Sequence, residues 1–257
     1  MTPARAKPGR DDAAAPVRIG MWSGPRNIST AMMRAWENRE DCAVVDEPLY
    51  AAYLMETGLD HPGRDEVITD GETDWERVVA TLLGPVPGGM PIWYQKHMSH
   101  HLLPEMDREW VHQLRNVFLI RDPEEVVASY EKARKDIEPD DLGVLQQAEL
   151  YDELAERGHA PLVVDAGDFL LAPEAYLRAL CDHLGVPFSE RMLGWPPGKR
   201  DTDGVWGPHW YESVWKSTGF EPAKARVTVE LDDEHAGVVE ACRPAYEKLH
   251  ARRLVVD

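Results

Sequence analysis

The sequence predicts an α/β protein with three layers, in which a P-loop-like parallel sheet is flanked by helices. Two observations support this class. Short apolar runs, each ending in polar or charged residues, alternate with stretches whose apolar residues recur at helical spacing. Continuous apolar runs are typical of strands buried on both faces of a parallel sheet.

The first strand, turn and helix form the clearest unit. Val17–Trp22 is an apolar-rich run, and the Ser23-Gly24-Pro25 segment after it predicts a turn. Helical spacing then predicts a helix from Ile28 to Asn38. Further strands are expected at Cys42–Val45, Ile92–Tyr94, Val117–Ile120 and Leu162–Val164, with helices at 73–83, 123–134, 143–157, 173–184 and 232–250.

The chain of 257 residues is long for one domain, but α/β domains of roughly 200–250 residues are common. We expect residues 1–16 to be disordered and residues 17–257 to form a single domain. The Gly194–Phe220 segment, rich in Gly, Pro and Trp, is long for a loop inside a compact domain. Its four tryptophans indicate an ordered, functional loop.

The charge and the cysteines exclude several classes of protein. The 28 basic and 46 acidic residues give a net charge of −18, which disfavours a nucleic-acid or anionic membrane surface. An anionic ligand therefore needs a local pocket. Three dispersed cysteines, with no run of apolar residues long enough to span a membrane, indicate a cytoplasmic protein without a disulfide framework.

The loop between the first strand and the first helix has the composition of an anion site. Backbone N–H groups at the helix N-terminus, the hydroxyls of Ser29 and Thr30 and the guanidinium of Arg26 are expected to converge there. The G-x-x-x-x-G-K-[ST] pattern is absent, which disfavours a P-loop kinase or hydrolase. The alternative is that Ser29 and Thr30 only cap the helix.

A second anion site is predicted after the Val117–Ile120 strand. Arg121 ends that strand, Pro123 suits the first turn of a helix, and Ser129 follows about two helical turns later. Arg121 and Ser129 can therefore flank one anion. The alternative is a helix start with Asp122 as its cap.

Together, these segments resemble the sulfotransferases that use 3′-phosphoadenosine 5′-phosphosulfate (PAPS). Pro25–Thr30 resembles their P-[KR]-S-G-T-T-like loop, and Arg121–Ser129 has the spacing of their R-[ND]-P…S motif. Met21–Arg26, Asp46–Tyr50 and Trp215–Phe220 are similar to a divergent branch marked by M-W-S-G-P-R, D-E-P-L-Y and W-x-x-S-T-G-F. The resemblance covers roughly residues 17–220.

This resemblance implies the sulfotransferase fold and in-line transfer of a sulfuryl group from PAPS to a small hydroxyl-bearing acceptor. Arg26 would contact the leaving oxygen, and no metal would be needed. Ser29 and Thr30 would hold the 5′-phosphate, and Arg121 and Ser129 the 3′-phosphate. The implied donor-binding residues are Ser23, Gly24, Arg26, Asn27, Ser29, Thr30, Arg121 and Ser129.

The chain departs from the family pattern in two places. Asn27-Ile28 stands where the family has Ser-Gly, and the late R-K-G-x-x-G motif is absent. The first departure keeps open an alternative function, in which a catalytically degenerate sulfotransferase fold binds an adenine nucleotide or a partner. The sequence also offers no H-x-x-x-H or C-x-x-C set of metal ligands.

Two residues are candidates for the general base. The resemblance places a glutamate at Glu47, whereas His97 lies in the region from which another branch takes its histidine; we favour Glu47. We expect the acceptor to contact Glu47, His97, His100, Trp206 and Trp210. The aromatic residues and the acidic composition suit a cationic or aromatic acceptor.

Overall fold

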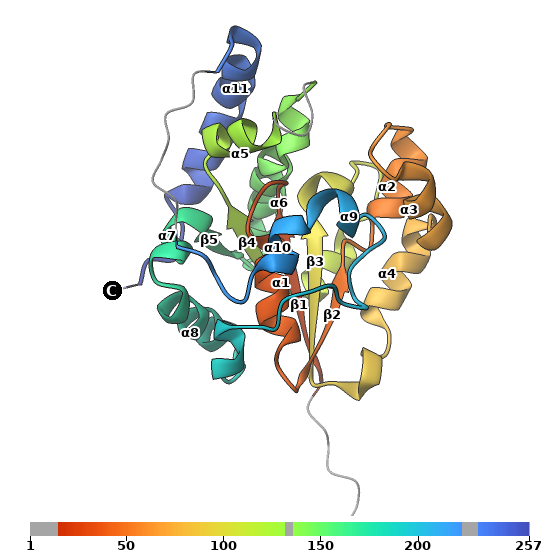
Figure 1. Ribbon diagram of the computed structural model, residues 1–257, viewed down its shortest axis with the longest axis vertical. Helices are drawn as coiled ribbons and strands as arrows, with labels where there is room; N and C mark the ends of the chain where they lie inside the picture. The colour runs from red at the N-terminus through yellow and green to blue at the C-terminus, as the bar shows by residue number, and fades with distance from the viewer. Residues whose placement is uncertain (1–14, 132–135, 223–230, 257) are drawn as a thin grey trace, which may run out of the picture.

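A computed structural model describes residues 15–131, 136–222 and 231–256 of the chain. Five parallel strands form one sheet in the order β2-β3-β1-β4-β5, flanked by helices (Figure 1). The predicted three-layer α/β class is confirmed. The expected disorder of residues 1–16 falls mainly on residues 1–14, which lie outside the described part. The strands are β1 Val17–Ser23, β2 Cys42–Asp46, β3 Ile92–Met98, β4 Arg115–Ile120 and β5 Leu162–Asp165.

The helices follow the predicted order, with additional helices between the predicted ones. The α-helices are α1 Ser29–Glu37, α2 Tyr50–Thr57, α3 Arg64–Asp70, α4 Trp75–Leu83, α5 Pro123–Tyr130, α6 Val144–Glu156, α7 Ala166–Leu171, α8 Pro173–His183, α9 Gly207–Trp210, α10 Glu212–Lys216 and α11 Asp233–His250. The sequence analysis did not predict α2, α3, α7, α9 and α10. The predicted 123–134 helix extends beyond α5 into residues 132–135, which are not described. No described helix has the length and apolar character needed to cross a bilayer.

Each strand contributes side chains to two apolar layers. On β1, Ile19 and Met21 pack toward α1, α7 and α8, whereas Trp22 packs toward α4, α6 and α11. Neighbouring residues of a strand point to opposite faces, and both faces of this sheet are covered. This explains why the strands read as continuous apolar runs.

The prediction that the third strand ends at Tyr94 is wrong, because β3 continues to Met98. Its polar residues find partners inside the protein, which removes the cost of burying them. The amide of Gln95 donates to the Leu82 carbonyl at 3.1 Å, and Lys96 forms an ion pair with Asp46. The polar residues therefore lie within the strand rather than in the loop after it.

The tryptophan-rich segment is ordered by contacts with the body of the protein. The Trp215 indole donates to Asp203 at 2.9 Å, and Asp203 also forms an ion pair with Arg34 on α1. Trp195 is buried, and its indole donates to Ser217 at 3.1 Å. In Figure 1, α9 of this segment lies near the arrowhead of β3, which brings the segment to the carboxyl end of the sheet.

Candidate active site

The β1–α1 loop lies where the order of the sheet changes direction. After β1 the chain builds β2 and β3 on one side, and then β4 and β5 on the other. In open parallel sheets, ligands bind beyond the strand ends at such a switch point. Gly24 is needed there, because a Cβ atom at this position would lie 2.1 Å from the carbonyl oxygen of Leu142.

The two predicted anion sites meet in one arginine cluster. The Nε of Arg26 donates to the Ser129 hydroxyl at 3.0 Å, and the guanidinium of Arg121 donates to the carbonyl oxygen of Arg26. Burial, followed by the nearby charge of Arg121, lowers the pKa of Arg26. Glu125 pairs with Arg121 at 3.1 Å, but no carboxylate of the described residues pairs with Arg26. A bound anion would relieve this concentration of positive charge.

The start of α1 leaves donors free for such an anion. Ser29 and Thr30 form the first turn and do not cap the helix, because Ile28 occupies the capping position. Within the described residues, the hydroxyls of Ser29 and Thr30 form no hydrogen bond. The N–H groups of a first helical turn also lack acceptors within their own helix.

Other residues of the loop hold its shape. The Asn27 amide donates to the Leu119 carbonyl at 3.0 Å and accepts from the N–H of Ile28 at 2.8 Å. Asn27 therefore attaches the loop to the end of β4. Ser23 is fully buried, and its hydroxyl donates to the Gly24 carbonyl at 2.8 Å. Asp122 caps α5 by accepting from the N–H of Glu124 at 3.0 Å, as the alternative interpretation of that segment expected.

Glu47 belongs to a buried polar cluster at the ends of β2 and β3. The Lys96 ammonium lies 2.5 Å from Glu47 Oε1, 2.8 Å from Asp46 Oδ1 and 2.8 Å from the Tyr211 hydroxyl. The pKa of Glu47 is raised, mainly by burial, although Lys96 opposes the shift. Glu47 Oε2 forms no hydrogen bond with the described residues. One oxygen is therefore held and the other is available.

Arg26 and Glu47 also share an unusual backbone conformation. Among the described residues, they are the non-glycine residues with positive φ, at 55° for Arg26 and 42° for Glu47. Such conformations cost free energy and concentrate at functional sites. Arg26 lies after β1 and Glu47 after β2, so both lie at the carboxyl end of the sheet.

The structure separates His97 from Glu47. His97 points to the opposite face of β3 from its neighbour Lys96 and stacks on Trp22, with 4.3 Å between ring centroids. Burial lowers the pKa of His97 to about 3. A histidine with so low a pKa is a weak base.

The remaining predicted acceptor residues lie in or beside an aromatic cluster. Trp206 contacts Tyr50 edge-on, at 5.2 Å between centroids, and Trp210 approaches Tyr130 at 6.5 Å. His100 contacts the edge of Tyr53 at 5.5 Å. These aromatic contacts connect the tryptophan-rich segment to α2 and α5.

Sequence reasoning missed Asp46, Lys96 and Tyr211 as site residues. Asp46 and Lys96 are register partners at the ends of β2 and β3, a pairing that requires knowledge of the strand order. The position of Asp46 beside Glu47 was the only local signal. Tyr211 had none, because its role depends on how the tryptophan-rich segment folds back.

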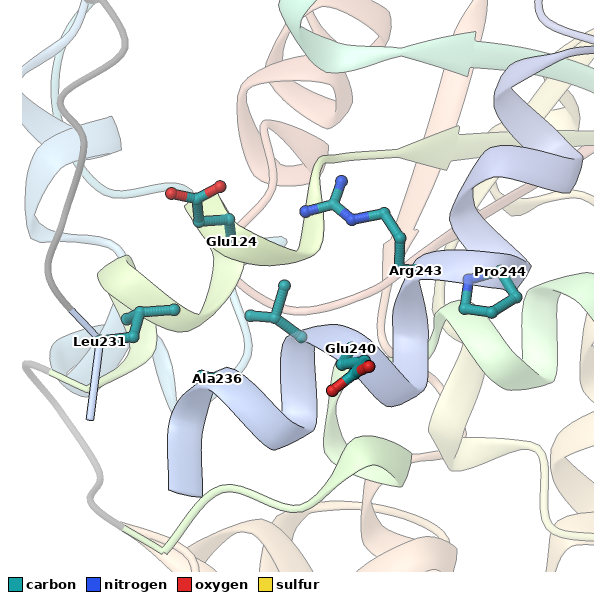
Figure 2. Close-up of a pocket in the computed structure, with 7 residues that line it drawn as sticks. Glu124, Leu231, Ala236, Glu240, Arg243 and Pro244 are labelled. Atoms are coloured by element: carbon teal, nitrogen blue, oxygen red, sulfur yellow. The ribbon is translucent and has the colours of Figure 1, made fainter. Parts of the chain in front are cut away.

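Two other features lie apart from these residues. A pocket of about 440 Å³ between α5 and α11 is lined by Glu124, Arg243 and mostly apolar neighbours (Figure 2), but none of the predicted site residues, all of them described, lines it. Asp165, Asp168 and His250 place potential metal ligands within 4.8 Å of one another beside β5. Asp165 already accepts hydrogen bonds there as the cap of α7.

The architecture is that of an α/β protein with a parallel sheet, and the predicted site residues with described positions gather mainly at the carboxyl end of that sheet. The chain matches the sulfotransferase domain family over residues 17–253, and it belongs to that family. Two solved structures share its fold. The sulfotransferase domain of the Synechococcus PCC 7002 olefin synthase superposes with a TM-score of 0.51 at 18% identity, covering 92% of this chain and 98% of that one. A sulfotransferase from Alicyclobacillus acidocaldarius gives 0.51 at 11% identity, covering 95% and 98%.

The chain is also similar to two longer plant proteins whose names refer to aminotransferases. Branched-chain-amino-acid aminotransferase-like proteins 2 and 1 of Arabidopsis thaliana are each 39% identical to this chain, over 235 and 241 residues. The matches cover 90% and 93% of this chain but 41% and 42% of those proteins. The chain therefore spans about two-fifths of the length of these relatives.

Proposed function

We propose that this protein transfers a sulfuryl group from PAPS to the hydroxyl of a small acceptor. One observation carries the proposal: the two described non-glycine residues on strained positive-φ backbone are the half-buried cation Arg26 and the carboxyl group Glu47, which follow β1 and β2 at the carboxyl end of the sheet. A cation for the leaving group and a base for the acceptor are what sulfuryl transfer needs. Membership of the sulfotransferase domain family supports the same reaction.

The first turn of α1 and the arginine cluster suit a donor whose ribose carries one phosphate at its 5′ position and another at its 3′ position. The first turn of α1, with Ser29 and Thr30, would hold the 5′-phosphate through its free donors. Arg121 and Ser129 would hold the 3′-phosphate. Arg26 would exchange its hydrogen bond to Ser129 for one to the oxygen that leaves with the phosphate, where negative charge develops.

Glu47 would accept the proton of the acceptor hydroxyl. Its Oε1 is held by Lys96, which leaves Oε2 for the acceptor. The raised pKa makes Glu47 a stronger base than an exposed glutamate. The acceptor oxygen forms a bond to sulfur as the bond between sulfur and the bridging oxygen breaks, and the proton passes to Glu47.

The acceptor would lie between Glu47 and the aromatic residues. Trp206 and Tyr50 are buried, whereas the half-buried Trp210 offers a flat apolar surface that suits an aromatic or cationic molecule. We further propose a cytoplasmic location, because Cys42, Cys181 and Cys242 are all buried free thiols.

Two measurements test this function. Thermal shift should show stabilisation by 3′-phosphoadenosine 5′-phosphate (PAP) without added metal, by about 2.7 kcal/mol at a hundredfold excess over Kd. Incubation with PAPS and a library of hydroxyl compounds, followed by mass spectrometry, should reveal a sulfated product that Glu47→Gln fails to make. Stabilisation by Mg-ATP but not by PAP would contradict the proposal. PAP binding without product from any acceptor would identify a degenerate, nucleotide-binding member of the family.

A further inference from the structure

Tyr211 connects the tryptophan-rich segment to the polar cluster around Glu47. It lies between α9 and α10, is 4% exposed, and belongs to neither of the strands that carry the cluster. Its hydroxyl accepts from the Lys96 ammonium at 2.8 Å and from the Trp206 indole at 3.0 Å, and donates to Asp46 Oδ2 at 2.7 Å. The proton and both lone pairs of this hydroxyl are therefore used.

We propose that Tyr211 is a positioning residue for Glu47, because its hydroxyl satisfies Asp46 and so leaves Lys96 to be shared with Glu47. This inference rests on the proposed sulfotransferase function. The three N–H groups of Lys96 have three acceptors: Asp46 Oδ1, Glu47 Oε1 and the Tyr211 hydroxyl. The hydroxyl also lies 3.4 Å from Glu47 Oε1.

Loss of the hydroxyl would redistribute these bonds in a predictable direction. Asp46 Oδ2 would lose its 2.7 Å donor and keep only the N–H of Gly204 at 3.5 Å. The side chain of Asp46 is 1% exposed, against 11% for Glu47, so its uncompensated charge is the costlier one. Lys96 would turn toward Asp46. Glu47 would then lose its anchor, and its carboxylate would be less well oriented toward the acceptor.

The same change would alter the titration of Glu47. The titratable groups that face Glu47 are Asp46 on β2, Lys96 on β3, Tyr50 on α2 and Tyr211 itself. Lys96 and Tyr211 stabilise the carboxylate form, whereas burial and Asp46 oppose it. Removing the hydroxyl weakens both stabilising contacts. The pKa of Glu47 is therefore expected to rise further.

The test compares Tyr211→Phe with Tyr246→Phe. The Tyr246 hydroxyl also donates to a buried aspartate, Asp165, at 3.0 Å. Asp165 belongs to β5, however, which is the outer strand on the other side of the sheet from β2 and Glu47. Tyr211→Phe should lower kcat roughly tenfold, leave PAP affinity within about twofold, and move the acidic limb of the kcat/KM profile to higher pH. Tyr246→Phe should leave all three unchanged.

A double-mutant cycle shows whether the effect passes through Glu47. In the Glu47→Gln background, Tyr211→Phe should lower activity far less than in the wild type. An unmoved acidic limb, or an equal loss in both backgrounds, would overturn the inference. If Tyr211→Phe does not fold, a fluorinated tyrosine at position 211 keeps the size of the side chain, and its hydroxyl is a stronger hydrogen-bond donor. This substitution should move the acidic limb of the kcat/KM profile to lower pH. An acidic limb that stays where it is in the wild type would overturn the inference.

A measurement without turnover separates this inference from the proposed function. The Glu47 carboxyl carbon, assigned by comparison with Glu47→Gln, can be titrated by ¹³C NMR. Its midpoint should lie at higher pH in Tyr211→Phe than in the wild type. If the wild type sulfates no acceptor but this shift is present, the proposed function fails and the positioning of Glu47 by Tyr211 stands. An unchanged midpoint overturns the positioning whatever the activity.

Discussion

His97 should make the fold sensitive to acid, and the size of the effect can be worked out from its burial. Its pKa of about 3 in the folded protein lies below the roughly 6.5 of an unfolded chain. The unfolded chain therefore takes up a proton that the folded protein refuses. The stabilisation is complete above pH 6.5 and is lost as the pH falls from about 6.5 toward 3. One pKa unit corresponds to about 1.36 kcal/mol, so the loss from about pH 7 to about pH 5 is roughly 2 kcal/mol.

His97→Phe is the appropriate variant, because it keeps a flat ring to stack on Trp22 and removes the titration. Urea unfolding at about pH 7 and about pH 5 should show a wild-type loss of free energy roughly 2 kcal/mol larger than that of the variant. Buried His101 also has a lowered pKa, mainly because of burial, and this contribution of burial is common to both proteins. Substitution of the exposed His183 by Gln is the control. If the free energy of unfolding has the same pH dependence in wild type and His97→Phe, then His97 takes up a proton between about pH 7 and about pH 5 as readily in the folded protein as in the unfolded chain. That result would contradict the low pKa and reopen the role of His97 as a base.

Three further variants probe the chemistry. Arg26→Ala should lower kcat more than PAP affinity, because the proposed interaction strengthens as charge develops on the leaving oxygen, and an unchanged kcat would remove Arg26 from the mechanism. Glu47→Gln should lower kcat by about 10²–10⁴-fold with PAP binding intact. His97→Asn should retain more activity than Glu47→Gln in the same assay; the reverse order would exchange the two roles.

The first unit of the fold was predictable because its signals are local. Strand, turn and helix from Val17 to Asn38 follow one another in the sequence, and each is marked by its own apolar spacing or by Gly and Pro. The arginines of the anion cluster were predictable for the same reason, since Arg121 ends an apolar run and Arg26 follows the Ser23-Gly24-Pro25 turn after another such run. Their convergence needed only the rule that parallel strands end at one edge.

The rest of the site depends on partners that are distant in the sequence. Lys96 meets Asp46 across 50 positions and Tyr211 across 115. Without those partners, Gln95-Lys96-His97 has the composition of a loop, which is why β3 was predicted to end too early. The separation of His97 from Glu47 follows from the same extension, because alternation along the strand sends Lys96 and His97 to opposite faces.

The central claim is that the first turn of α1 and the arginine cluster together bind the two phosphates of a PAPS-type nucleotide, with Arg121 at the 3′-phosphate. Calorimetry of PAP and of adenosine 5′-phosphate, which lacks the 3′-phosphate, tests it directly in the wild type and in Arg121→Ala. The account predicts metal-independent PAP binding, a loss of roughly 1.5–3 kcal/mol for PAP in Arg121→Ala, and little change for adenosine 5′-phosphate. Equal losses for the two nucleotides, or no PAP binding by the wild type, would contradict it.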